Sequence, residues 1–141
     1  MRFLLAAAVL LSGPALADEP ILFPYDGSFE DATFAVESAI VDRGLVIDFE
    51  SHVGDMLNRT GADVGSGAKI FDEANVFLFC SAVVSREVME IDPNNIQHCP
   101  YGVFVTDKDG EVKIGHRTYP EGAMQKVQTL LSEIAKEASE F

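Results

Sequence analysis

Three residues in the middle of the chain have side chains that could bind a metal ion or exchange electrons. They are Cys80, His98 and Cys99, and the last two are adjacent in the sequence. Thiolate sulfur and imidazole nitrogen are ligands that suit copper and haem iron. The sequence therefore suggests copper or haem as a cofactor, with these three residues as candidate ligands. Additional candidate ligands are His52, His116 and Met89, for which a hydrogen-bonded histidine or a core methionine is the alternative interpretation.

The same two cysteines could instead form a disulfide, either structural or redox-active. An even pair in an oxidising compartment favours a bond, and closing a loop of about 20 residues would contribute roughly 3 kcal/mol to stability. The bond requires the strand that ends at Cys80 and the strand that follows Cys99 to be antiparallel neighbours. A parallel crossover would place the cysteines at opposite ends of their strands, and the connecting segment permits either topology.

The N-terminus predicts export. Arg2 is followed by an unbroken apolar run over residues 3–11, and the small residues Ala15 and Ala17 occupy the positions that a signal peptidase reads. The run is about half the ~20 residues needed to span a bilayer. We therefore expect a signal peptide over residues 1–17, cleaved after Ala17, and a periplasmic or secreted protein with a single domain over residues 18–141.

The charge of the mature chain restricts its partners. Without Arg2 it carries 9 basic and 23 acidic side chains, a net charge of −14. A chain this acidic is repelled by nucleic acid and by anionic lipid head groups, whereas metal ions and basic partners are favoured. No later segment is apolar and long enough to span a membrane. We expect no nucleic acid and no membrane span; the expected partners are a small molecule, a metal ion or another periplasmic protein.

Hydrophobic periodicity and turn residues predict alternating strands and helices. Ser28 is a favourable N-cap, Gly44 is a typical helix stop, and Asp109-Gly110 is a typical hairpin turn. This order indicates an α+β fold, a two-layer sandwich with helices packed on a mixed, mainly antiparallel sheet. We expect strands over residues 22–25, 45–49, 75–79, 101–106 and 111–116, and helices over residues 28–43, 53–59, 83–90 and 121–139.

Several local patterns resemble functional motifs but lack essential parts. In residues 61–69, the lysine does not follow the last glycine and no Ser or Thr comes after it, as a phosphate-binding loop requires. Residues 107–110 lack the glycine spacing of a calcium loop, so a hairpin turn is the better interpretation. There is no Cys-x-x-Cys motif and no local nucleophile–base set. No catalytic residue is assigned, and a binding protein is favoured over an acid–base enzyme.

The chain also resembles the domain-of-unknown-function family 302 over roughly residues 20–120. The shared parts include the helix start at residues 28–31, the strand ending at Cys80, Cys99 ahead of an apolar strand, and the hairpin at residues 107–112. The residues around the cysteines differ from the family pattern, in which a cysteine after a strand precedes Asn-Pro, because Cys80 is followed by Ser81 and Ala82 here. The resemblance implies a compact α+β domain that is often a dimer, and it implies no activity.

Three functions are consistent with these observations. The first is a periplasmic binding protein for a metal, haem or small sulfur compound, with the cysteine pair at or near its site. The second is a thiol–disulfide redox protein that uses the same pair. The third is an interaction module in which the disulfide is only structural.

Overall fold

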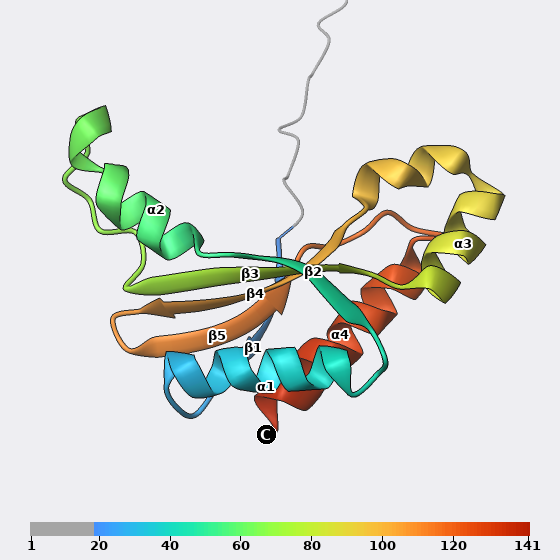
Figure 1. The fold of residues 1–141 in the computed structure, drawn as a ribbon, viewed down its shortest axis with the longest axis horizontal. Coiled ribbons are helices and arrows are strands. Elements are labelled where there is room, and N and C mark those ends of the chain that lie inside the picture. Colours follow the sequence, from blue (N-terminus) through green and yellow to red (C-terminus); the bar gives the residue numbers. More distant parts are fainter. Residues whose placement is uncertain (1–18) are drawn as a thin grey trace, which may run out of the picture.

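The computed structural model describes residues 19–141, so the expected signal peptide lies outside the described residues. Every strand and helix predicted from the sequence is present, with two short 3-10 helices in addition (Figure 1). The elements are β1 (Ile21–Pro24), α1 (Phe29–Val41), β2 (Val46–Ser51), α2 (Val53–Thr60), the 3-10 helix η1 (Ala62–Val64), β3 (Glu73–Cys80), α3 (Ala82–Ile91), the 3-10 helix η2 (Pro93–His98), β4 (Tyr101–Lys108), β5 (Glu111–His116) and α4 (Gln125–Ser139).

The five strands form one sheet in the order β1-β5-β4-β3-β2, and every pairing is antiparallel. Helices α1 and α4 pack against the same face of the sheet, whereas α2 lies at one end and α3 with η2 at the other (Figure 1). The α+β expectation is confirmed. The sequence predicted a mixed, mainly antiparallel sheet, but the described strands contain no parallel pair. The reason is that α3 and η2 return the chain to the end of the sheet where β3 stopped, so β4 runs antiparallel to β3.

The core lies between this face and the two helices. Ser28 caps α1 as predicted, since its hydroxyl accepts a hydrogen bond from the backbone N–H of Asp31 at 3.1 Å. Helix α4 begins later than predicted, because Gly122 adopts a positive φ of 91° that interrupts a helix. The largest core side chains include Val36, Ile40, Phe77, Phe79, Tyr101, Val103, Val105, Ile114, Leu131 and Ile134, all at most 2% exposed.

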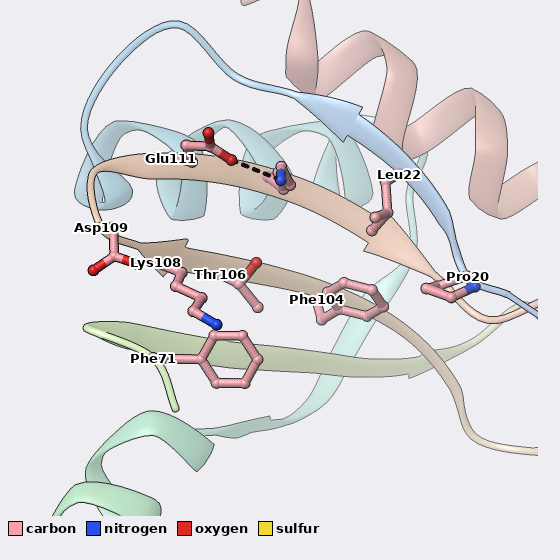
Figure 2. A pocket seen from close by; sticks show the side chains of 9 residues that line it. Pro20, Leu22, Phe71, Phe104, Thr106, Lys108, Asp109 and Glu111 are labelled. Atoms are coloured by element: carbon pink, nitrogen blue, oxygen red, sulfur yellow. Dashed lines mark hydrogen bonds and ion pairs between the residues drawn. The ribbon is translucent and has the colours of Figure 1, made fainter. Parts of the chain in front are cut away.

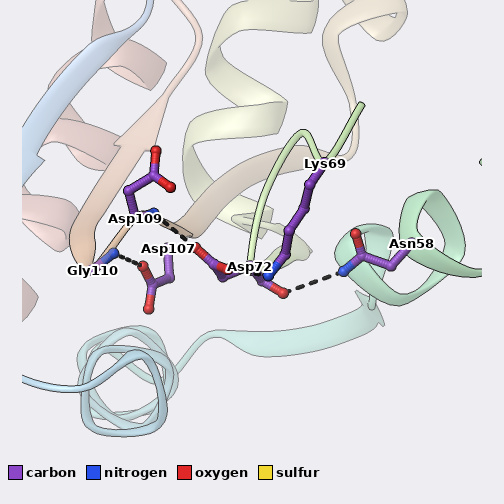
Figure 3. Close-up of polar contacts among 6 residues, drawn as sticks. All are labelled: Asn58, Lys69, Asp72, Asp107, Asp109 and Gly110. Carbon is purple, nitrogen blue, oxygen red and sulfur yellow. Dashed lines mark hydrogen bonds and ion pairs between the residues drawn. The ribbon is translucent and has the colours of Figure 1, made fainter. Parts of the chain in front are cut away.

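The β4–β5 hairpin has the predicted turn. Asp109 and Gly110 both adopt positive φ, 56° and 81°, as in the two-residue turns that fit strand twist. The backbone N–H of Gly110 donates to the Asp107 carboxylate at 3.0 Å, and that of Asp109 donates to the Asp72 carboxylate at 2.7 Å (Figure 3). Asp72 also pairs with Lys69. Asp107 therefore stabilises the turn, and Asp72 joins the segment before β3 to it.

No helix within residues 19–141 is long and apolar enough to cross a membrane.

Candidate functional site

The fold brings the two cysteines together at one end of the sheet. Strands β3 and β4 are antiparallel neighbours, and Phe79 pairs with Tyr101 at the end of their ladder. Cys80 follows Phe79 and Cys99 precedes Pro100, so both cysteines lie just beyond this last pair. Their Sγ atoms are 2.7 Å apart and are not bonded. A disulfide bond is about 2.05 Å long, so a small side-chain adjustment would close it.

Helix α3 places a hydroxyl group beside the pair. Ser81 caps the helix by accepting a hydrogen bond from the backbone N–H of Val84 at 3.2 Å, so α3 starts directly after Cys80. One turn later, the hydroxyl of Ser85 lies 3.8 Å from the Sγ of Cys99 and 3.0 Å from the hydroxyl of buried Tyr101. The pair therefore borders a short polar chain that the sequence did not indicate.

The surroundings distinguish the two thiols. Burial, the hydrogen bond with Cys99 and the nearby charge of Cys99 together raise the pKa of Cys80 to about 12. Burial also raises the pKa of Tyr101. Cys80 therefore stays a neutral thiol at neutral pH. The Ser85 hydroxyl beside the Cys99 sulfur can donate to a thiolate there, and only a thiolate attacks a disulfide, so Cys99 is the better candidate for the first attacking group.

The side chain of His98, adjacent to Cys99, packs against a cluster of aromatic rings. Its ring meets that of Tyr119 edge-on at 5.8 Å, Tyr119 meets Tyr101 at 6.3 Å, and the Arg117 guanidinium lies 5.5 Å from the Tyr119 ring centre. Burial, followed by the charge of Arg117, lowers the pKa of His98, and burial raises the pKa of Tyr119 to about 12. Both side chains are therefore neutral at pH 7. The Nδ1 atom of His98 and the hydroxyl of Tyr119 are buried without a hydrogen-bond partner.

The additional candidate ligands lie elsewhere. His52 is exposed before α2 and contacts the Asn75 side chain at 3.1 Å, whereas Met89 packs against the core. His116 is completely buried in β5 and hydrogen-bonded on both ring nitrogens. Residues 19–141 contain no group of three or more His, Cys, Asp or Glu side chains that could hold a metal ion. The copper or haem site thus stays a prediction, with two neighbouring sulfur atoms and, in residues 19–141, no third His, Cys, Asp or Glu grouped with them.

His116 predicts a pH dependence of stability. Its Nδ1 lies 2.8 Å from the Arg117 carbonyl oxygen, which can only accept, so Nδ1 carries the proton and Nε2 accepts from the Ser132 hydroxyl at 2.9 Å. Burial lowers the pKa of His116 in the folded state. The unfolded chain therefore takes up this proton first. Stability should be complete above the unfolded pKa of about 6.5 and fall as the pH drops from there toward the folded pKa.

Urea unfolding of wild type and His116→Gln between pH 7.5 and 5 tests this expectation. The histidine should contribute a slope of at most about 1.4 kcal/mol per pH unit, and His116→Gln should lack that part. His52→Gln, a change at an exposed side chain, is the matched control and should keep the wild-type slope. Equal slopes for wild type and His116→Gln would contradict the prediction.

The fold and the cysteine pair define the chain as a small two-layer α+β domain with two thiols in contact at one end of its sheet. It belongs to the family described as "Domain of unknown function DUF302", whose model matches residues 22–140. The predicted family is confirmed, and the match extends through α4.

A comparison with solved structures finds the same fold in another protein of this family. The chain is similar to an uncharacterized conserved DUF302 protein from Bacillus stearothermophilus, with a TM-score of 0.63 and 13% sequence identity. The alignment covers 86% of this chain and 93% of that chain. At this identity the likeness shows the fold alone. No curated protein matches the chain.

Proposed function

We propose that this protein is a small exported thiol–disulfide protein in which Cys80 and Cys99 alternate between a dithiol and a disulfide. The observation that supports the proposal is the 2.7 Å separation of the two Sγ atoms at the end of adjacent antiparallel strands. A copper or haem site supported by the chain would gain from further ligands, and residues 19–141 group no third His, Cys, Asp or Glu with the two sulfur atoms. The geometry therefore favours exchange with a disulfide over metal or haem binding.

The reaction begins at Cys99. Its thiolate attacks one sulfur of a partner disulfide, a Cys99–partner bond forms, the partner S–S bond breaks, and the first partner thiol leaves with a proton. Attack by Cys80 on the Cys99 sulfur then forms the Cys80–Cys99 bond and releases the second partner thiol. The protein loses two electrons and two protons, and the partner disulfide gains them. The Ser85 hydroxyl, 3.8 Å from the Cys99 sulfur, is placed to donate to the thiolate.

The environment of Cys80 fits the second step. Burial is the largest cause of its raised pKa, but the charge of Cys99 contributes. Once Cys99 has formed the mixed disulfide, that charge is gone, so Cys80 loses its proton more easily than before. The acidic net charge of the mature chain favours a basic exported protein as the partner that carries the disulfide.

The redox potential of the pair is the decisive measurement. Mature protein purified without reductant should have a mass about two daltons below the reduced value, and equilibration with glutathione should give a potential above roughly −230 mV. A potential below about −300 mV would contradict the proposal and indicate a structural disulfide in an interaction module. Two free thiols together with a visible absorption band would indicate copper or haem instead.

Single cysteine variants test the order of the steps. Cys80→Ser leaves Cys99 available, so oxidised glutathione should add one glutathione to this variant rapidly. Cys99→Ser leaves only the half-buried Cys80, and its burial alone still raises the pKa of this thiol, so its glutathione adduct should form more slowly than that of Cys80→Ser. Mass spectrometry of quenched samples measures both rates. Equal rates, or faster reaction of Cys80, would assign the first attack to the wrong cysteine.

A further inference from the structure

A groove lies on the face of the sheet opposite α1 and α4, and the proposed thiol chemistry does not use it (Figure 2). Its volume is about 530 Å³, within the range of small-molecule sites in proteins. Its walls come from β1, β4, β5 and the segment before β3. The residues that line it are Pro20, Leu22, Phe71, Phe104, Thr106, Lys108, Asp109, Glu111 and Lys113.

The floor of the groove is formed by Leu22 and Phe104, which can meet there because Gly115 between them has no side chain. A Cβ at this position would lie 2.6 Å from Cδ2 of Leu22 and 2.7 Å from Cζ of Phe104. The glycine therefore lets Leu22 and Phe104 approach each other across β5. Phe71 adds a second aromatic ring beside β4 (Figure 2). Leu22 is 47% exposed, so this apolar surface is open to solvent.

One end of this floor carries an unpaired positive charge. Phe104, Thr106 and Lys108 are every second residue of β4, so they lie on the same face of the strand. The Lys108 side chain extends toward Phe71 (Figure 2). Across the part of the chain that the structure describes, Lys108 has no ion-pair partner, whereas Lys113 pairs with Glu111 at 2.9 Å. The carboxylate of Asp109 points away from the apolar floor (Figure 2).

We propose that this groove binds a free fatty-acid anion. Its alkyl chain would cover Leu22, Phe104 and Phe71, and its carboxylate would accept hydrogen bonds from the Lys108 ammonium and the Thr106 hydroxyl. The lining includes two lysines and two acidic residues, so the local charge is balanced although the chain as a whole is strongly acidic. The charge that faces the apolar floor is positive, which favours an anionic head group over a cationic one.

Two amphiphiles with the same tail and opposite head groups test the proposal. The mature protein is titrated by calorimetry with dodecanoate and with dodecyltrimethylammonium, each below its micellar concentration. Dodecanoate should bind more tightly. Lys108→Met should weaken dodecanoate binding roughly two- to fivefold, the range for one solvent-exposed ion pair, and should not weaken binding of the cation. Lys136→Met, a change at an exposed side chain of α4 away from the groove, is the matched control and should change neither affinity.

A substitution in the floor separates the tail from the head group. Leu22→Asn should weaken binding of both amphiphiles, while circular dichroism checks that the fold is retained. The proposal is overturned if dodecanoate shows no saturable binding, if the cation binds as tightly as dodecanoate, or if Lys108→Met leaves dodecanoate binding unchanged. Sedimentation that shows a dimer whose formation excludes dodecanoate would also overturn it, by assigning the groove to a second copy of the chain.

Discussion

Replacing Cys99 with serine should lower the free energy of unfolding of the oxidised protein by about 3 kcal/mol. The physical reason is that a Cys80–Cys99 bond closes a loop whose ends are 19 positions apart, which reduces the entropy of the unfolded chain. Denaturation in urea without reductant, followed by circular dichroism, measures the difference.

Reductant supplies the control for this prediction. Wild type in excess dithiothreitol should fall to nearly the stability of Cys99→Ser, and the variant itself should not respond to reductant. Ser81→Ala, which removes the adjacent helix cap without touching the thiols, should cost about 1 kcal/mol and leave the response to reductant intact. A wild-type stability that is the same with and without reductant would show that the two cysteines do not bond.

Phe79→Ala should destabilise the domain by about 3–5 kcal/mol, the usual cost of removing a buried aromatic side chain. Phe79 is fully buried on the helix-facing side of β3, between its partners Ile47 in β2 and Tyr101 in β4. The truncation removes apolar contacts and leaves a cavity beneath α1 and α4. Urea unfolding at pH 7.5 measures the change in unfolding free energy.

Phe49→Ala is the matched control, because it makes the same chemical change on the neighbouring strand. Phe49 is 60% exposed and pairs with Leu78, on the other face of the sheet. It should cost less than about 1 kcal/mol. If both variants lose the same stability, the burial assigned to the two faces of the sheet is wrong.

Much of the fold could be predicted because the periodic patterns are local. The apolar spacing in α4, from Val127 through Leu131 to Ala138, matches the buried face of the helix. The cap at Ser28 and the turn at Asp109 were predicted by residue type alone. The contact between the cysteines was not decided by the sequence, because it depends on whether β3 and β4 are antiparallel neighbours.

The rest of the candidate site depends on contacts between distant segments. Nothing in the sequence indicates that His98 packs against Tyr119, which comes 21 positions later, after the whole β4–β5 hairpin. Ser85 had a weak signal, since it lies one turn after Ser81 at the start of α3. Its contacts with Cys99 and Tyr101 arise only because η2 returns the chain to the same place.

The position of α3 and η2 between the two cysteines has a consequence for local unfolding. Val88 is the one fully buried residue of α3, and η2 contributes none, so this segment adds little to the core. Segments with few buried apolar contacts open before the global transition. A Cys80–Cys99 bond would fasten both ends of this segment to the sheet. Whether Cys80 and Cys99 are oxidised would then set how often the segment opens, and so how exposed its peptide bonds are to proteases. The packing of α1 and α4 on the sheet would not depend on this bond.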